Sequence, residues 1–185
     1  MRIIAGRLKG RRLKTPTWEG VRPTSDRLRE TLFNILTPRM LDARVLDVFA
    51  GTGALGIEAI SRGAADVTFV EQDRRAQALI AENLAHCSVA SGYTIVRADA
   101  LRGLTSLRQG RGYDVILLDP PYGLDRTEVV RTLAAAGALL GPDGVLVFEH
   151  ARRTPTPDPV EGLYHARDVT SGDSALSFYE RHKGQ

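Results

Sequence analysis

Residues 45–56 read VLDVFAGTGALG, and this stretch decides the fold. Its first six residues are apolar apart from a single aspartate, which is typical of a strand covered on both faces. A helix is predicted to follow at 53–62. Gly51 and Gly53 lack the Cβ atoms that would keep a ligand away from the backbone, and Gly56 allows helix and strand to approach closely. The order strand, glycine-rich turn, helix therefore predicts a ligand-binding turn.

The alternation of strand and helix continues outward from this turn to residue 149. Further strands are predicted at 67–70, 93–96, 115–118 and 145–149, with helices at 74–85, 101–107 and 127–140. Two alternating segments, 163–169 and 175–180, then form an antiparallel hairpin with a turn at 170–173. This pattern predicts an open, mostly parallel α/β sheet, in which ligands bind beyond the carboxyl ends of the strands.

Length and composition agree with an ordinary globular protein. The chain has 185 residues, of which 43% are hydrophobic and 25% charged. This size predicts one main domain with a small appendage. No apolar run reaches the roughly 20 residues of a membrane span, and the N-terminus lacks the apolar stretch of a signal peptide. The single cysteine, Cys87, forms no internal disulfide, so we expect a cytoplasmic protein.

Positive charge is concentrated at the N-terminus. Residues 1–31 hold nine Arg or Lys and three Asp or Glu, whereas the whole chain has a net charge of only +3. Segments 3–8 and 12–15 predict a short basic hairpin that projects from the body, and Asp26 is expected to cap the helix that follows. We therefore divide the chain into a basic, RNA-contacting extension at 1–41 and a main domain at 42–185. Five side chains of the extension are expected to contact phosphates: Arg7, Lys9, Arg11, Arg12 and Lys14. Arg22 and Arg27 flank the start of the helix, and we expect them to contact the nucleic acid near the cofactor edge.

An acid at the end of the second strand indicates a nucleoside ligand. Glu71 lies 20 residues after Gly51, where a carboxylate can accept hydrogen bonds from ribose hydroxyls. A phosphate-binding P-loop is excluded because Ile57 and Glu58 stand where it needs Lys and Ser or Thr. A dinucleotide and S-adenosylmethionine both remain compatible. Asp99 follows the third strand, where it can accept from an adenine amino group, cap the next helix, or do both.

The second motif is Leu117-Leu118-Asp119-Pro120-Pro121-Tyr122, at the end of the fourth strand. The two prolines fix the backbone and cannot continue the sheet, so they hold the Asp119 carboxylate and the Pro120 carbonyl as two rigid acceptors. An exocyclic amino group of a nucleobase offers two N–H donors to such a pair. Tyr122 offers a face on which the base can stack. The motif predicts methyl transfer from a sulfonium to a nucleobase amine.

These motifs resemble those of the S-adenosylmethionine-dependent amino methyltransferases with an Asp/Asn-Pro-Pro-aromatic sequence. Within that group the chain is similar to the RsmD-type methyltransferases, which modify N2 of a guanine in bacterial small-subunit ribosomal RNA. The resemblance covers nearly the whole chain. Outside the two motifs it rests on residues 2–6 (RIIAG), Gly10-Arg11, 22–27 (RPTSDR) and 33–36 (FNIL).

The resemblance implies a Rossmann-like class I fold with a seven-stranded sheet and a reversed final hairpin. It implies methylation of guanine 966 in 16S ribosomal RNA, within a partly assembled small subunit. The residues that it implies for S-adenosylmethionine are Asp47, Phe49, Ala50, Gly51, Gly53, Glu71, Gln72, Asp99 and Ala100. Those that it implies for the guanine and the catalytic corner are Asp119, Pro120, Pro121 and Tyr122.

Three other functions share parts of this pattern. They are a DNA amino methyltransferase acting on adenine or cytosine, an NAD(P)-dependent oxidoreductase, and an RNA-binding assembly factor without turnover. The chain has no room for the large target-recognition domain of a DNA enzyme, and the Asp-Pro-Pro-Tyr motif has no role in an oxidoreductase. The four histidines lack metal-ligand spacing, so we expect no metal. We also expect no membrane association, and we expect the protein to be a monomer.

Overall fold

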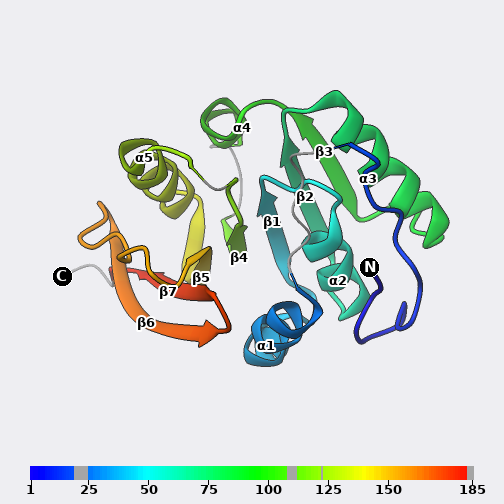
Figure 1. Cartoon of the computed structure of the whole chain (residues 1–185), viewed down its shortest axis with the longest axis horizontal. Coiled ribbons are helices and arrows are strands. Elements are labelled where there is room, and N and C mark those ends of the chain that lie inside the picture. The colour runs from blue at the N-terminus through cyan, green and yellow to red at the C-terminus, as the bar shows by residue number, and fades with distance from the viewer. Residues whose placement is uncertain (19–24, 108–111, 122, 183–185) are drawn as a thin grey trace.

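The computed structural model describes residues 1–18, 25–107, 112–121 and 123–182 (Figure 1). Its strands are β1 (Arg44–Val48), β2 (Asp66–Glu71), β3 (Tyr93–Arg97), β4 (Tyr113–Leu118), β5 (Leu140–Ala151), β6 (Leu163–Ser171) and β7 (Ser174–Arg181). Its helices are α1 (Asp26–Leu36), α2 (Ala54–Ser61), α3 (Arg74–His86), α4 (Ala100–Ser106) and α5 (Arg126–Gly137), with a 3₁₀ turn, η1 (Thr37–Arg39). Every strand and helix predicted in the main domain is present, with ends shifted by a few residues.

The seven strands form one sheet in the order β3-β2-β1-β4-β5-β7-β6. The first five strands are parallel, and β7 runs antiparallel to both β5 and β6. The predicted fold class is confirmed, including the C-terminal hairpin. After β3 the chain crosses to the other side of β1 and enters β4, so the strand order reverses between β1 and β4. In open α/β sheets this switch point is where ligands bind.

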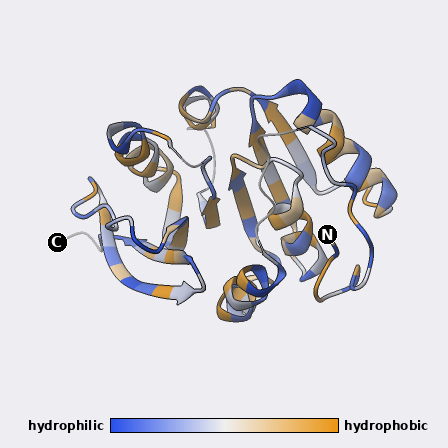
Figure 2. Ribbon diagram, viewed as in Figure 1, coloured by the Kyte–Doolittle hydropathy of each residue, from blue (hydrophilic) through white to orange (hydrophobic). Residues whose placement is uncertain are grey.

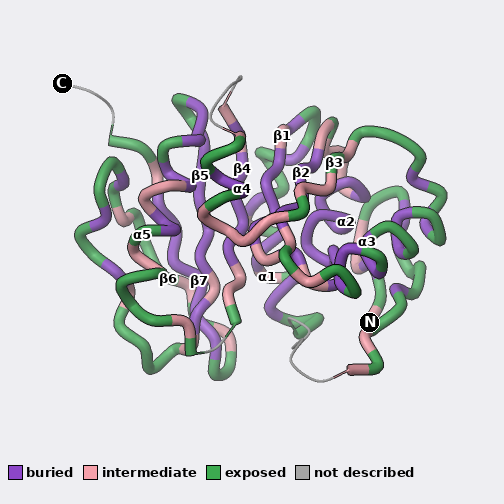
Figure 3. The backbone as a smooth tube through the Cα atoms, turned by 90° about the horizontal axis from the view of Figure 1, so that it is seen from above, coloured by how far each residue is buried: buried purple, intermediate pink, exposed green. Residues whose placement is uncertain are grey.

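Helices cover both faces of the sheet, in three layers (Figure 1). Residues of α1, α2 and α3 share one core cluster with alternate strand residues such as Val45, Phe69 and Leu117. The opposite face, with Leu46 and Ile116, packs against α4 and α5. The strands are accordingly rich in hydrophobic residues (Figure 2), and the centre of the sheet is buried while the outer helix faces are exposed (Figure 3).

The basic N-terminal segment does not project from the body, contrary to the prediction. Ile3, Leu8 and Leu13 are 1%, 4% and 5% exposed and belong to the core cluster on the α1–α3 face. The expected hairpin is reduced to a single antiparallel bridge between Arg2 and Arg12. Each buried aliphatic side chain contributes about 1.5–3 kcal/mol, which explains why the segment folds back despite its charge.

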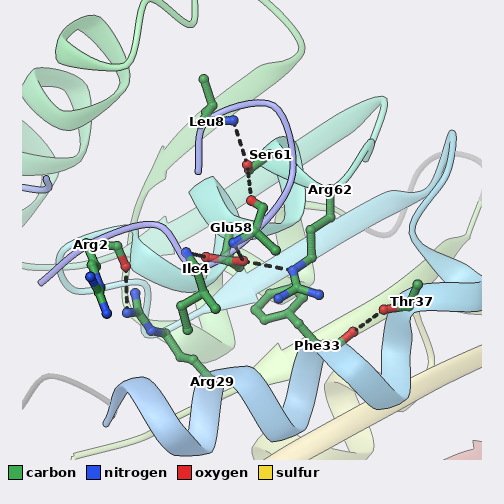
Figure 4. Close-up of polar contacts among 10 residues, drawn as sticks. Arg2, Ile4, Leu8, Arg29, Phe33, Thr37, Glu58, Ser61 and Arg62 are labelled. Carbon is green, nitrogen blue, oxygen red and sulfur yellow. Dashed lines mark hydrogen bonds and ion pairs between the residues drawn. The ribbon is translucent and has the colours of Figure 1, made fainter. Parts of the chain in front are cut away.

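A buried carboxylate fastens this segment to α2 (Figure 4). Glu58 is fully buried and accepts hydrogen bonds from the backbone N–H groups of Ile4 (2.8 Å) and Ala5 (3.0 Å) and from Arg62 Nε (2.8 Å). Ser61 Oγ accepts from the Leu8 N–H at 2.9 Å. Residues 1–41 therefore share their packing with the main domain, and their separate RNA-contacting role stays a prediction.

Two local predictions are corrected. The helix α1 is capped by Ser25, whose side chain accepts from the Leu28 N–H, and not by Asp26, which is the first helical residue. β5 begins at Leu140 and not after the predicted 141–144 turn. The register with β4 shifts between Tyr113 and Val115, so the Pro- and Gly-containing segment is accommodated as an irregularity within the strand.

Candidate functional site

A pocket of about 840 Å³ lies at the carboxyl ends of the parallel strands, at the switch point between β1 and β4. Its described lining comes from three sources: the turns after β1, β2 and β4, the end of β5 with the β6–β7 turn, and the N-terminal segment with the start of α1. The first group is Asp47, Phe49–Thr52, Ala54, Leu55, Glu71–Asp73, Ala76 and Asp119–Pro121. The others are Glu149, Ser171–Ser174, Met1, Trp18, Ser25 and Arg27.

The glycine-rich turn has the backbone that its sequence predicts. Gly51 and Gly53 have positive φ angles of 53° and 76°, which glycine adopts without steric cost. Phe49 also has a positive φ, 64°, which is unusual for a bulky residue and marks a local constraint beside the pocket. A Cβ on Gly56 would collide with the Phe69 ring, so this glycine does permit close helix–strand packing.

Glu71 joins this turn to the next strand. Its Oε2 accepts from the Gly51 N–H at 2.9 Å, and its Oε1 accepts from the Asp73 N–H at 2.8 Å. These bonds fix the carboxylate at the edge of the pocket. Each oxygen of an ionised carboxylate has a further lone pair, so the group can also accept from two hydroxyls of a ribose.

Asp47 is the most deeply buried acid of the pocket. It is 1% exposed, and its Oδ2 accepts from the Gly56 N–H at 2.9 Å. Burial raises the pKa of this carboxyl well above its usual value; the Gly56 hydrogen bond lowers it, and the negative charges of Asp119 and Glu71 raise it further. Asp47 therefore anchors the start of α2 beneath the turn.

The second motif opens into the same pocket. Asp119, Pro120 and Pro121 follow β4 directly and line the cavity next to the glycine-rich turn. The predicted stacking residue, Tyr122, lies outside the described residues. β1 and β4 are hydrogen-bonded neighbours with Val48 opposite Leu118, and this register brings the two motifs together.

Of the remaining described residues predicted to bind the cofactor, one lines the pocket and three do not. Gln72 lines the pocket, whereas Gly53, Asp99 and Ala100 are not among its described lining residues. Gly53 is the N-cap residue of α2. Asp99 caps α4 by accepting from the Arg102 N–H at 2.9 Å, so one of its two predicted roles is present. Its contact with an adenine stays a prediction.

The basic residues occupy different environments. Arg7, Lys9 and Arg12 are exposed, and their side chains form no ion pair or hydrogen bond with other described residues. Arg11 donates to the His86 carbonyl (3.1 Å) and Lys14 to Glu82 (3.1 Å), so both lie along α3. Arg27 lines the pocket, and its contact with nucleic acid stays a prediction; Arg22 lies outside the described residues.

Part of the pocket wall was missed by sequence reasoning. Glu149 ends the predicted fifth strand, and the turn Ser171–Ser174 joins the final strands. Only the strand order could have indicated these residues. Since β6 runs parallel to β5, the carboxyl end of β6 reaches the same edge of the sheet as the carboxyl end of β5. Trp18 stacks on the Arg75 guanidinium, which lies 5.0 Å from the ring centre, and also lines the pocket.

Among the described residues, no helix is both long and apolar enough to cross a membrane. The same part of the chain contains no group of three or more His, Cys, Asp or Glu side chains that could hold a metal ion.

The sheet order and the position of the pocket define the fold of the class I methyltransferases. The rRNA methyltransferase AviRa from Streptomyces viridochromogenes shares this fold, with a TM-score of 0.70 at 18% identity over 90% of this chain and 88% of that chain. A Thermus hypothetical protein has a TM-score of 0.84 at 32% identity, covering 97% of this chain and 99% of the other.

Sequence comparison identifies the family. The model described as conserved hypothetical protein 95 matches residues 1–180. The ribosomal RNA small subunit methyltransferase D of Escherichia coli is 36% identical over 98% of this chain and 90% of its own length. The protein of that name in Haemophilus influenzae is 34% identical over 97% and 93%. The chain belongs to the conserved hypothetical protein 95 family, and the resemblance to the RsmD-type methyltransferases is confirmed.

Proposed function

We propose that this protein transfers a methyl group from S-adenosylmethionine to the N2 amino group of a guanine in small-subunit ribosomal RNA. The observation that carries the proposal is the shared pocket. Asp119 and Pro120, the predicted acceptors for an amine, and Gly51 and Glu71, the predicted nucleoside contacts, line one cavity.

The first half of the pocket fits S-adenosylmethionine. Gly51 exposes its backbone at the turn, and Glu71 is held at the strand end where it can accept from ribose hydroxyls. Ala50 and Leu55 provide an apolar wall beside them. When bound, S-adenosylmethionine supplies an electrophilic methyl group on a positively charged sulfur.

The second half fits a nucleobase amine. The Asp119 carboxylate and the Pro120 carbonyl accept the two N–H bonds of the amine and orient its lone pair toward the cofactor half. The nitrogen becomes positively charged as it attacks, so the negative charge of Asp119 stabilises the transition state more than the ground state. The excess proton then leaves to water or to Asp119. The base has to be unstacked to reach this corner, as in a loop or by flipping.

Ribosomal RNA is favoured as the substrate by the names of the relatives, which are ribosomal RNA small subunit methyltransferases. The exposed cations Arg7, Lys9 and Arg12, whose side chains pair with no other residue in the described part of the chain, suit a polyanion. These observations favour RNA over the DNA alternative. The guanine N2 assignment, position 966 and the assembling subunit as substrate follow from the family resemblance and belong to the proposal.

Methyl transfer followed by mass mapping tests the proposal. Ribosomal RNA and small-subunit particles from a strain lacking the gene are incubated with the protein and tritiated S-adenosylmethionine. We expect one methyl group on N2 of a single guanine in the small-subunit RNA. Label on an adenine or cytosine, or no transfer to either substrate, would contradict the proposal.

A further inference from the structure

Resting on the proposed function, we propose that Glu149 selects guanine by accepting a hydrogen bond from its N1–H while Asp119 holds the neighbouring N2 amine. Glu149 lies at the end of β5 and lines the same pocket as Asp119. It was not among the site residues predicted from the two motifs.

The register of the sheet places these acids side by side. Leu118 pairs with Phe148 in the parallel β4–β5 ladder, so the next residues along each strand are Asp119 and Glu149. Neighbouring strands are about 4.8 Å apart, which is the separation expected between the two backbones at this level. Asp119 thus follows the last residue of β4, and Glu149 lies beside it near the end of β5, at the edge of the sheet where the pocket lies.

Alternation along each strand puts both side chains on the same face. Leu117 and Val147, two residues earlier, belong to the core cluster on the α1–α3 face. Side chains repeat every second residue in a strand, so Asp119 and Glu149 project toward that face too. This face also carries Asp47, whose pKa is influenced by the charge of Asp119.

Two adjacent carboxylates match one nucleobase edge better than the others. The Watson–Crick edge of guanine has two neighbouring donors, N1–H and the N2 amine. Adenine and cytosine each have an unprotonated ring nitrogen beside their amine. Placing that lone pair against a carboxylate leaves two acceptors facing each other without a proton between them, which is unfavourable in a desolvated pocket. The pair Asp119 and Glu149 therefore favours guanine.

The β6–β7 turn can serve the remaining group of the guanine edge, the O6 oxygen. Ser171 ends β6 and Ser174 begins β7, and both residues line the same pocket as Glu149. Residue 174 pairs with Ala151 on the adjoining strand, close in register to Glu149. A hydroxyl can donate to the O6 oxygen of guanine. The pocket then offers guanine one donor and two acceptors in a row. The serine hydroxyl faces O6, the Glu149 carboxylate faces N1–H, and the Asp119 carboxylate faces the N2 amine.

A modified base at the methylated position tests this role. After mass mapping locates the methylated nucleotide, small-subunit RNA is ligated with either guanine or 2-aminopurine at that position. 2-Aminopurine keeps the N2 amine but lacks N1–H and O6. We expect the wild-type protein to prefer guanine in kcat/KM by roughly 10- to 100-fold, the effect of losing a hydrogen bond to a charged group.

The variant Glu149→Gln is expected to reduce this preference. The glutamine amide can accept from guanine N1–H or, after rotation, donate to the bare N1 of 2-aminopurine. The guanine preference should therefore fall at least about fivefold relative to the wild type. The exposed Glu161→Gln is the matched control and should leave the preference unchanged.

The outcomes separate this inference from the proposed function. Unchanged discrimination in Glu149→Gln, with N2 methylation of guanine intact, would overturn the role of Glu149 and leave the proposed function standing. Absence of guanine N2 methylation by the wild type would overturn both. Calorimetry with S-adenosylmethionine verifies that the variant is folded, because Glu149 is not expected to contact the cofactor.

Discussion

The backbone N–H of Gly51 donates a 2.9 Å hydrogen bond to Glu71 Oε2, linking the turn after β1 to the end of β2. These are the two residues whose spacing first indicated a nucleoside site. The bond means that Glu71 shapes the turn as well as offering oxygens to a ligand. Both functions depend on its carboxylate.

Replacing Glu71 with alanine should weaken S-adenosylmethionine binding by about 1.5–3 kcal/mol, the range for hydrogen bonds to a charged group. The Gly51 and Asp73 N–H groups also lose their acceptor. Isothermal titration calorimetry measures the affinity, with the exposed Glu128→Ala as the control. An affinity equal to that of the wild type would mean that a different acid binds the ribose.

The fold was predictable because its signals are local. Each parallel strand is a short apolar run, and each turn carries glycine, proline or a capping acid, as at residues 45–56. The position of the N-terminal segment was not predictable from its charge. It depends on Ile3, Leu8 and Leu13 meeting a surface formed by residues far along the chain, and on the buried Glu58 that accepts their neighbours' N–H groups.

The candidate site was predictable only where its residues belong to a sequence motif. Asp119 and Glu71 lie in recognisable motifs at strand ends. Glu149 and the Ser171–Ser174 turn carry no motif, and they reach the pocket only through the strand order and register. Asp99 illustrates the reverse case, because a helix cap and a ligand contact have the same local sequence.

Glu58 should contribute more to stability than an exposed acid. Glu58→Ala leaves the Ile4 and Ala5 N–H groups and the Arg62 guanidinium without their acceptor, which should lower the free energy of unfolding by about 3–5 kcal/mol. Urea denaturation measures the change. Glu82→Ala removes the exposed ion pair with Lys14 and should cost less than about 1 kcal/mol. Equal effects of the two substitutions would show that Glu58 does not fasten the N-terminal segment.

Asp47 should make stability depend on pH in a defined direction. Its folded-state pKa lies above the usual 3.8, so the native state binds the proton more tightly than the unfolded state. The stabilising contribution is complete below pH 3.8 and is lost as the pH rises through the folded-state pKa. Asp47→Asn does not titrate and keeps an oxygen acceptor for Gly56. Its unfolding free energy minus that of the wild type should therefore increase from about pH 4 upward; a difference that is constant or falls between pH 4 and 8 would contradict the raised pKa.

The exposed cations of the N-terminal segment should control the salt dependence of RNA binding. Neutralising Arg7, Lys9 and Arg12 to glutamine should reduce the slope of log K against log salt by about 2, since each phosphate contact to single-stranded RNA contributes about 0.7. Filter binding with small-subunit ribosomal RNA measures the slope. The control variant neutralises Arg131 and Arg153, which are exposed elsewhere. A slope equal to that of the wild type would show that the three cations are simply solvated.

The most direct test of the account is the turnover of Asp119→Ala. If the Asp119 carboxylate holds and stabilises the attacking amine, kcat for methyl transfer to small-subunit RNA should fall roughly 10²-fold or more, by analogy with the loss of one preorganised electrostatic group. S-Adenosylmethionine affinity, measured by calorimetry on the same variant, should stay within about threefold of the wild type. Turnover near the wild-type value in this variant would contradict the central claim that the Asp-Pro-Pro corner activates a nucleobase amine.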